Sequence, residues 1–273
     1  MEIGINTNNE CGKSYKEICD NIKKVGFKNV MIAFKIGEEE EQIKYALNLG
    51  LNIPYVHLDN GFTNNLWVKG AAHDYWLNLI KAEIDLCGKY GIKIAVIHAT
   101  VGDPNCVVIS PNDFALQTFK DLVDYAQYKD VKIALENVDA NGLNHFRFLL
   151  DNIKSDNLGF CYDVGHQNLY ARNLNLIDLY GDRLLAIHLH DNLGDYQLGD
   201  DYTRDLHYIP FDGNVDYEKV IKGLKQTQYN NVIMLEVHKN PLGTPKLYQN
   251  LSATDFLQKA KQSAEKIRDL LAN

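Results

Sequence analysis

The hydrophobic positions of this chain follow two alternating patterns, short apolar runs and longer stretches with helical spacing. The apolar runs predict strands over residues 2–6, 29–34, 51–57, 92–98, 131–137, 158–163, 184–190 and 232–237. The stretches with helical spacing predict helices over residues 14–25, 38–49, 72–90, 111–128, 143–153, 174–180, 217–226 and 252–271. Strands and helices that alternate in this way indicate a parallel sheet with helices packed on its faces.

The eight strand–helix units favour a closed sheet, so the predicted fold is a single (β/α)8 TIM barrel of the α/β class. We expect one domain over residues 1–273, because no linker-like break in composition divides the chain. A doubly wound open sheet is the alternative. However, no Gly-x-Gly-x-x-Gly loop follows any strand and no Walker loop is present, so no nucleotide cofactor is expected.

The overall charge narrows the range of partners. The chain has 36 acidic and 28 basic residues and a formal net charge of −8. This balance argues against the broad basic surface that nucleic acids require, so no nucleic-acid partner is expected. The first residues enter a strand pattern without a basic leader, and no stretch approaches the roughly 20 apolar residues of a membrane span. We therefore expect no membrane partner either.

The cysteines are odd in number and widely spaced, at positions 11, 19, 87, 106 and 161. No Cys-x-x-Cys pair exists, so neither a disulfide framework nor a thiolate zinc site is expected. Reduced thiols fit a cytoplasmic protein. The sequence leaves the oligomeric state open, and a homo-oligomer is compatible with it.

Six of the predicted strands end in a side chain that can bind a metal ion. These side chains are His57, His98, Glu136, Asp163, His188 and Glu236. One such residue would be an ordinary strand end, but all the strands of a barrel end at the same rim. We therefore predict that these three histidines and three carboxylates form one site.

Side-chain alternation along the strands supports this prediction. Residues two positions before a ligand share its side and are predicted to fill the barrel: Val96, Ala134, Cys161, Ala186 and Met234. Residues one position before a ligand point to the other side of the strand and are predicted to pack against the outer helices: Ile97, Leu135, Tyr162, Ile187 and Leu235. Three carboxylates at one rim would repel each other strongly, and a bound divalent cation removes that conflict. The predicted ligand set is Glu136, Asp163, His188 and Glu236.

Further polar residues are candidates for substrate binding or for additional metal ions: His57, His98, His166, Asp205 and His207. His166 follows Asp163 by three residues, whereas Asp205 and His207 lie in the long irregular stretch of residues 191–214. Three other histidines are interpreted as surface or loop residues: His73, His145 and His238.

Weaker candidates lie beside these positions. His190 lies two residues after His188, so both side chains are expected on the same side of the strand. The sequence leaves open whether His190 contacts a metal ligand or caps a helix. Phe62 and Trp67, in the predicted loop of residues 59–70, either cover a substrate or pack beneath the loop. Arg204 is a weak candidate for binding a substrate oxygen.

Five motifs, in chain order, resemble the xylose isomerase-like TIM barrels, a superfamily of sugar and sugar-phosphate isomerases and epimerases that also contains endonuclease IV. The motifs are Leu135-Glu136-Asn137, Tyr162-Asp163-Val164-Gly165-His166, Ile187-His188-Leu189-His190-Asp191, Asp205-Leu206-His207-Tyr208-Ile209-Pro210 with Asp212-Gly213 and Asp216, and Leu235-Glu236. The resemblance covers nearly the whole chain. It implies a divalent ion held by Glu136, Asp163, His188 and Glu236, with the two glutamates also transferring the substrate's proton.

The implied activity is the isomerisation or epimerisation of a sugar or sugar phosphate, by proton transfer through a metal-stabilised enediolate. His166 would bind a substrate oxygen. Oxygen-rich ligation with one imidazole suits Mn²⁺ or Mg²⁺, whereas additional histidines favour Zn²⁺. A dehydratase acting on an inosose-like ring is a variant of this interpretation, and a sugar-binding protein without activity is the non-enzyme alternative.

The competing enzyme hypothesis is a phosphodiester hydrolase of the endonuclease IV type, with three zinc ions. Its ligand set would be His57, His98, Glu136, Asp163, His166, His188, Asp205, His207 and Glu236, and all of these residue types are present. The acidic balance of the chain and the lack of Lys/Arg clusters in the rim loops favour sugar chemistry instead. The segment after His98 also favours it, because Ala99-Thr100-Val101-Gly102 replaces the Pro-Gly-Ser that is usual in that branch.

Overall fold

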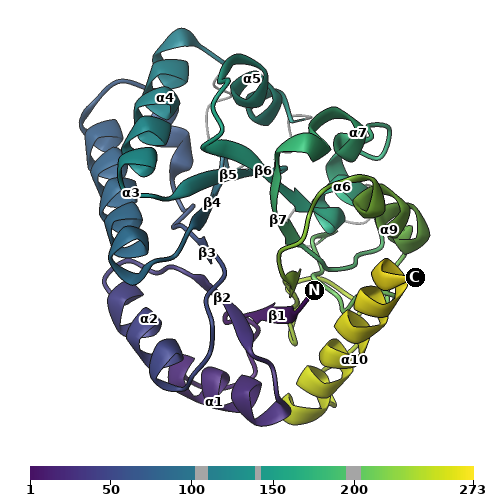
Figure 1. Cartoon of the computed structure of the whole chain (residues 1–273). Coiled ribbons are helices and arrows are strands. Elements are labelled where there is room, and N and C mark those ends of the chain that lie inside the picture. The colour runs from purple at the N-terminus through teal and green to yellow at the C-terminus, as the bar shows by residue number, and fades with distance from the viewer. Residues whose placement is uncertain (102–109, 139–142, 195–203) are drawn as a thin grey trace.

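The computed structural model describes residues 1–101, 110–138, 143–194 and 204–273. Its strands are β1 (Ile3–Asn6), β2 (Asn29–Ala33), β3 (Val56–His57), β4 (Ile94–His98), β5 (Lys132–Glu136), β6 (Leu158–Asp163), β7 (Leu184–His188) and β8 (Ile233–Leu235). They pair in the order β7-β6-β5-β4-β3-β2-β1-β8, and the paired neighbours run parallel. A parallel bridge between Leu189 and Leu235 joins the two ends of this order, so the strands form a nearly closed barrel (Figure 1). The predicted (β/α)8 fold is confirmed.

Helices surround the strands on the outside of the barrel in Figure 1. They are α1 (Tyr15–Val25), α2 (Glu39–Asn48), α3 (Ala71–Tyr90), α4 (Asp113–Tyr128), α5 (Asn144–Asn152), α6 (Val164–Tyr170), α7 (Leu176–Tyr180), α9 (Tyr217–Gln226) and α10 (Ala253–Ala272), with short 3-10 turns at η1 (Thr63–Trp67) and η2 (Gly181–Arg183). Local signals explain their ends. Ser14 Oγ accepts the Glu17 N–H at the start of α1, and Gly26 ends that helix in a left-handed conformation. In the described ranges, none of the helices combines the length and apolar character that a membrane crossing requires.

A small apolar cluster fills the interior of the barrel, separate from the main core. Its fully buried members include Met31, Tyr55, Val96, Ala134, Cys161, Ala186 and Met234. The last five are the residues that strand parity places inside the barrel, and the predicted outward residues pack in the large cluster beneath the helices. The hydroxyl of Tyr55 donates a 2.6 Å hydrogen bond to Ile187 O, so β3 and β7 are tied together across the barrel, below the rim.

Two elements differ from the predicted pattern. The third strand covers only Val56–His57 instead of residues 51–57, because Pro54 has no N–H to donate and interrupts the ladder. The second difference is α6, which begins directly after Asp163, where the hydrophobic pattern predicts no helix. Asp163 Oδ1 accepts the His166 N–H at 2.6 Å and caps this helix. A side chain predicted as a ligand therefore also starts a helix.

The cysteines that the structure describes are free, as the sequence predicts. Cys11, Cys19, Cys87 and Cys161 are all buried. Burial also raises the pKa of the Cys161 thiol to about 12, so this thiol stays protonated at neutral pH. Cys106 and Gly102 lie outside the described residues, as does part of the irregular stretch of residues 191–214.

Buried Asp191 organises the segment between β7 and α9. Its carboxylate accepts hydrogen bonds from the backbone N–H groups of Asn192 at 2.9 Å and of Phe211 and Val215 at 3.0 Å. Gly213 packs closely on this carboxylate, so that a Cβ there would lie 2.3 Å from Asp191 Oδ1 and from Asn192 O. The Asp191 carboxylate thus explains why a glycine follows Asp212.

Replacing Gly213 with alanine is expected to destabilise the protein by about 1–3 kcal/mol, because neither a buried carboxylate nor a backbone oxygen yields easily. Gly223 in α9 provides the matched control, since a Cβ there meets nothing closer than 3.6 Å and alanine suits a helix. Chemical denaturation of both variants measures the difference. Equal stability of Gly213→Ala and Gly223→Ala would show that the segment adjusts without cost.

Candidate metal centre

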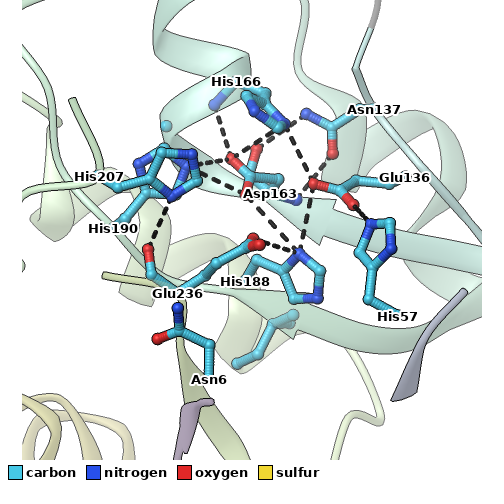
Figure 2. A network of polar contacts seen from close by, with 12 residues as sticks. Asn6, His57, Glu136, Asn137, Asp163, His166, His188, His190, His207 and Glu236 are labelled. Carbon is cyan, nitrogen blue, oxygen red and sulfur yellow. Dashed lines mark hydrogen bonds and ion pairs between the residues drawn. The ribbon is translucent and has the colours of Figure 1, made fainter. Parts of the chain in front are cut away.

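The predicted ligand set meets at the ends of the neighbouring strands β5, β6, β7 and β8. One ligand atom of each residue lies within 4.8 Å of the others: Glu136, Asp163, His188 and Glu236. His188 Nδ1 lies 2.8 Å from Glu236 Oε2 and 3.3 Å from Glu136 Oε1. It lies 3.8 Å from Asp163 Oδ2. Figure 2 shows the three carboxylates converging on this imidazole. Ligand atoms that are far apart in the chain are therefore within reach of one point.

A second group lies beside the first and shares Glu136 with it. Its other members are His57, at the end of β3, and His98, at the end of β4. His57 Nε2 lies 3.0 Å from Glu136 Oε2 and 3.1 Å from His98 Nε2. His57 Nδ1 lies 2.7 Å from Leu58 O, a contact that places the ring proton on Nδ1. In the neutral ring, Nε2 and Glu136 Oε2 are then two acceptors facing each other, and a cation resolves that conflict.

His166, His190, Asp205 and His207 form a third group. His166 Nε2 and His207 Nε2 lie 3.0 Å and 2.9 Å from the same oxygen, Asp205 Oδ2. His207 Nδ1 lies 2.9 Å from Glu236 O, which again places the proton on Nδ1 and leaves Nε2 as the lone pair. His166 Nδ1 lies 3.1 Å from Glu136 Oε1, so this group adjoins the first. The structure thus brings all nine ligand candidates of the sequence together.

Two buried asparagines brace the strand ends that carry these ligands. Asn137 Nδ2 donates to Asp163 O at 2.8 Å, and its Oδ1 accepts the Asp163 N–H at 2.7 Å. Asn6, at the end of β1, makes the same pair of bonds to the backbone of Val237, at 3.2 Å and 3.0 Å. Both side chains are fully buried. The sequence alone indicated no role for Asn6 or Asn137, although both are polar residues directly at strand ends.

Burial and charge pairing have opposite effects on the pKa values of several groups of the centre. Burial acts to raise the pKa of the Glu136 carboxyl, but His188 and His98 outweigh it and hold that pKa well below its usual range. Burial acts to lower the pKa of His166, but Asp163 and Asp205 raise it well above its usual value. Against its burial, Asp205 also raises the pKa of His207 to about 9. Because His166 and His207 hold their protons firmly, metal binding at these rings must release protons.

Several buried ligand atoms have no hydrogen-bond partner among the described residues: Glu136 Oε1, His166 Nδ1, both ring nitrogens of His188, Asp205 Oδ1 and Glu236 Oε2. Four of these atoms, Glu136 Oε1, His166 Nδ1, His188 Nδ1 and Glu236 Oε2, approach one another within ion-pair distance, but without the angles of hydrogen bonds. Buried polar atoms without partners are rare in proteins. Carboxylate and imidazole lone pairs that converge in this way are a typical donor set for a divalent ion. The residues present therefore fit such an ion.

A cavity of about 590 Å³ opens above the ligands. Polar ligands from the three groups line it: His57, His98, Glu136, His166, Asp205, His207 and Glu236. Apolar and aromatic side chains form much of the rest of its lining: Phe34, Leu58, Phe62, Val101, Val138, Tyr170, Pro241 and Leu242. An apolar enclosure with a few convergent polar groups is typical of a small-molecule site.

The weaker candidates have different positions relative to this cavity. Phe62 lines it and is 57% exposed. Trp67 is buried against Phe119, and its indole N–H donates to Ala99 O at 2.7 Å. Trp67 therefore packs beneath the loop, which is the alternative that the sequence left open. Arg204 is half-buried and is not among the described residues that line the cavity.

The interpretation of His73, His145 and His238 as surface or loop residues is wrong for His73 and His145. His73 and His145 are buried, the first with Nε2 3.1 Å from Thr118 Oγ1. His238 lines the cavity and stacks on His207, with the ring centroids 4.7 Å apart. Burial and the neighbouring His207 lower the pKa of His238 to about 3, so its ring is neutral. Strand parity could have found His238, because it follows Glu236 by two residues.

Comparison with known proteins places this geometry in context. The chain matches the family model of the xylose isomerase-like TIM barrels over residues 19–269. It is 29% identical over 206 residues to the uncharacterized protein y4fM of Sinorhizobium fredii, a match that covers 72% of this chain but only 61% of that protein. It is 24% identical over 207 residues to inosose isomerase of Bacillus subtilis, covering 74% of this chain and 71% of that protein.

Solved structures show the same fold at lower sequence identity. D-psicose 3-epimerase with D-tagatose, from Clostridium cellulolyticum H10, has a TM-score of 0.78 at 15% identity, over 99% of both chains. The IOLI protein, described with a zinc atom, has a TM-score of 0.75 at 18% identity, over 100% of this chain and 98% of that one. At these identities the likeness bears on the fold alone. The family match, which extends over most of the sequence, shows that this chain belongs to the xylose isomerase-like TIM barrels.

Proposed function

We propose that this protein is a divalent-metal-dependent isomerase or epimerase that acts on a sugar, a sugar phosphate or a related polyhydroxy ketone. The observation that carries the proposal is the convergence of Glu136 and Glu236 with an aspartate and a histidine beneath one cavity. The names of two similar proteins, inosose isomerase and D-psicose 3-epimerase, agree with this class of reaction. The family match supports it in the same general way.

Each residue of the first group has a role in this proposal. Glu136, Asp163, His188 and Glu236 would hold the ion, which supplies Lewis-acid stabilisation of the charge that develops on the substrate's oxygen atoms. Glu136 and Glu236 also line the cavity, so they present carboxylates to a bound substrate. Despite their burial, His188 keeps both carboxylates ionised at neutral pH, as a base requires. One glutamate removes the proton beside the carbonyl, and the other returns it. His166 binds a substrate oxygen.

The number of bound ions decides the charge of the centre. Four carboxylates belong to the three groups: Glu136, Asp163, Asp205 and Glu236. With neutral imidazoles, one divalent ion leaves a surplus of two negative charges, whereas three ions leave a surplus of two positive charges. A negative surplus favours an uncharged substrate such as a free sugar. A positive surplus favours a phosphodiester or another anion.

A phosphodiester hydrolase with several ions is the second candidate function. The observation that favours it is the presence of two further ligand groups, one around His57 and His98 and one around Asp205. In both groups a backbone carbonyl holds the proton of one histidine on Nδ1 and leaves Nε2 as a ligand atom. The net charge of −8 opposes this candidate, because a protein that binds nucleic acid needs a basic surface.

The deciding experiment combines metal content with two activity assays. Elemental analysis of protein purified without chelator measures the ions per chain. A panel of inososes and ketohexoses in D2O, followed by NMR, detects deuterium that enters the carbon beside the carbonyl. Nicking of abasic-site DNA tests the hydrolase. We expect one tightly bound ion, deuterium exchange on at least one polyol, and no nicking.

Other outcomes separate the alternatives. Three ions with DNA nicking would establish the hydrolase and overturn the isomerase. Loss of water from an inosose, seen as a change in product mass, would identify the dehydratase variant. Absence of any ion would overturn both metal-dependent functions.

A further inference from the structure

His190 lies beside the Asp163 carboxylate, on the segment that follows β7 (Figure 2). Its ring is fully buried, and Nε2 lies 2.9 Å from Asp163 Oδ1 and 3.1 Å from Oδ2. The ring stacks on His207, with the centroids 3.9 Å apart and the planes at 14°. The backbone oxygen of His190 accepts a 2.9 Å hydrogen bond from the hydroxyl of Tyr217. Contacts from several elements therefore hold the ring against Asp163.

His190 belongs to the third ligand group by distance, but it cannot bind the same ion as His207. An ion bound by an imidazole lies in the plane of the ring, along the lone pair of the nitrogen. The rings of His190 and His207 lie in separate, nearly parallel planes, so one ion cannot lie in both. His207 directs its Nε2 to Asp205 at 2.9 Å. His190 Nε2 lies 2.9 Å from Asp163 Oδ1 but 3.9 Å from Asp205 Oδ1, so its closer partner is Asp163.

The contact with Asp163 determines which nitrogen of His190 carries the proton. An ionised carboxylate only accepts hydrogen bonds, so the Nε2–H of His190 must donate. Asp163 Oδ1 also accepts the backbone N–H of His166 at 2.6 Å. Oδ1 therefore accepts from two donors, while Oδ2 shares the His190 contact at 3.1 Å and faces His188, 3.8 Å away. The two donors set the rotation of the carboxylate, and Oδ2 keeps a second lone pair for an ion.

Gly165 makes room for this arrangement. A Cβ at that position would lie 2.0 Å from Cε1 of His190, and 2.4 Å and 2.6 Å from its two ring nitrogens. Gly165 lies in α6 and is not among the glycines with a positive φ, so its missing side chain serves His190 and not a turn. The motif from Asp163 to His166 and the motif around His188 are thus one packing unit.

We propose that His190 is a positioning residue that holds the Asp163 carboxylate in the orientation needed to bind the ion, and so sets the metal affinity. This inference rests on the metal centre of the proposed function. It adds a residue that contacts neither the ion nor the substrate. Partners that orient a metal ligand commonly change metal affinity about 10–100-fold.

Competition with a chelator tests the proposal, because it measures the dissociation constant for Mn²⁺ or Zn²⁺ without any activity assay. We expect His190→Leu to weaken binding about 10–100-fold. His190→Gln keeps a side-chain N–H donor and should restore at least part of the affinity. His73→Leu is the matched control, since it removes another buried imidazole that is bonded to Thr118 on α4, away from the centre. The control should lose stability and keep its metal affinity.

The possible failures are distinguishable. If the wild-type protein binds no ion, both the proposed metal centre and the proposed role of His190 are overturned. If the wild type binds an ion and folded His190→Leu binds it equally well, only the role of His190 falls. If His190→Leu does not fold, Gly165→Ala provides the decision, because its Cβ must displace the same ring. Unchanged affinity in that variant would overturn the proposal.

Discussion

Replacing Glu136 with glutamine is expected to remove metal binding and to reduce turnover by about 10³-fold or more. One Glu136 oxygen lies 3.0 Å from His57 and 3.2 Å from His98. The other lies 3.1 Å from His166 and 3.3 Å from His188. An amide would place an N–H₂ donor on one of these two sides and would remove the negative charge. Elemental analysis and steady-state kinetics measure the two losses.

Glu83→Gln is the matched control for this variant. Glu83 is another buried carboxyl, on α3, and accepts the backbone N–H of Asp59 at 3.1 Å. Burial raises its pKa to about 9, so the group is already neutral at pH 7 and the amide has nearly the same shape. We expect its metal content and turnover to equal those of the wild type. Full metal content and activity in Glu136→Gln would show that the centre does not depend on its shared carboxylate.

In the presence of a chelator, raising the pH from about 6.5 to 9 is expected to lower the free energy of unfolding of the metal-free protein by about 3 kcal/mol. This change is the contribution of His207 alone. Against its burial, Asp205 raises the pKa of His207 from 6.5 to about 9. The folded protein therefore holds more protons than the unfolded chain in this window. The resulting stabilisation is complete below pH 6.5 and is lost as the pH rises through the folded pKa. The carboxylates act at the acid end, because their lowered pKa values stabilise the fold above about pH 4.5.

The same titration should strengthen metal binding as the pH rises, because the imidazoles must lose their protons to become ligands. Denaturation curves at pH 6.5, 8 and 9, with chelator and with saturating Zn²⁺, measure both effects. His207→Gln should flatten the slope of the chelated protein. A stability that stays constant or rises with pH in chelator would contradict the ion pair between His207 and Asp205.

Much of the fold could be predicted because a parallel barrel repeats one simple pattern. Apolar runs that end in a polar residue indicate both the strands and the rim at which they end, and parity then separated Val96 and Ala134 from Ile97 and Leu135. The errors have local causes. Pro54 shortens β3, and the capping by Asp163 starts α6 in a segment whose apolar spacing is too short to indicate a helix.

The candidate site was predictable only where the chain order determines the geometry. Ligands at strand ends had to meet, so their convergence followed from the fold. The residues that contact and orient those ligands could not be predicted from the fold, because their contacts join segments that are distant in sequence. Gly165 illustrates this, because only the position of the His190 ring shows why this residue lacks a side chain. Trp67 could be assigned to its packing role only once its hydrogen bond to Ala99 was known.

The origin of the cavity lining has a consequence for how the proposed activity could diversify. The reactive groups stand mostly at strand ends above a rigid apolar plug, whereas Phe62 and Leu242 project from loops and are 57% and 78% exposed. Substitutions at these loop positions cost little in stability. A mutant library confined to them should therefore alter which molecules are accepted while preserving the chemical step, and evolution had the same route available.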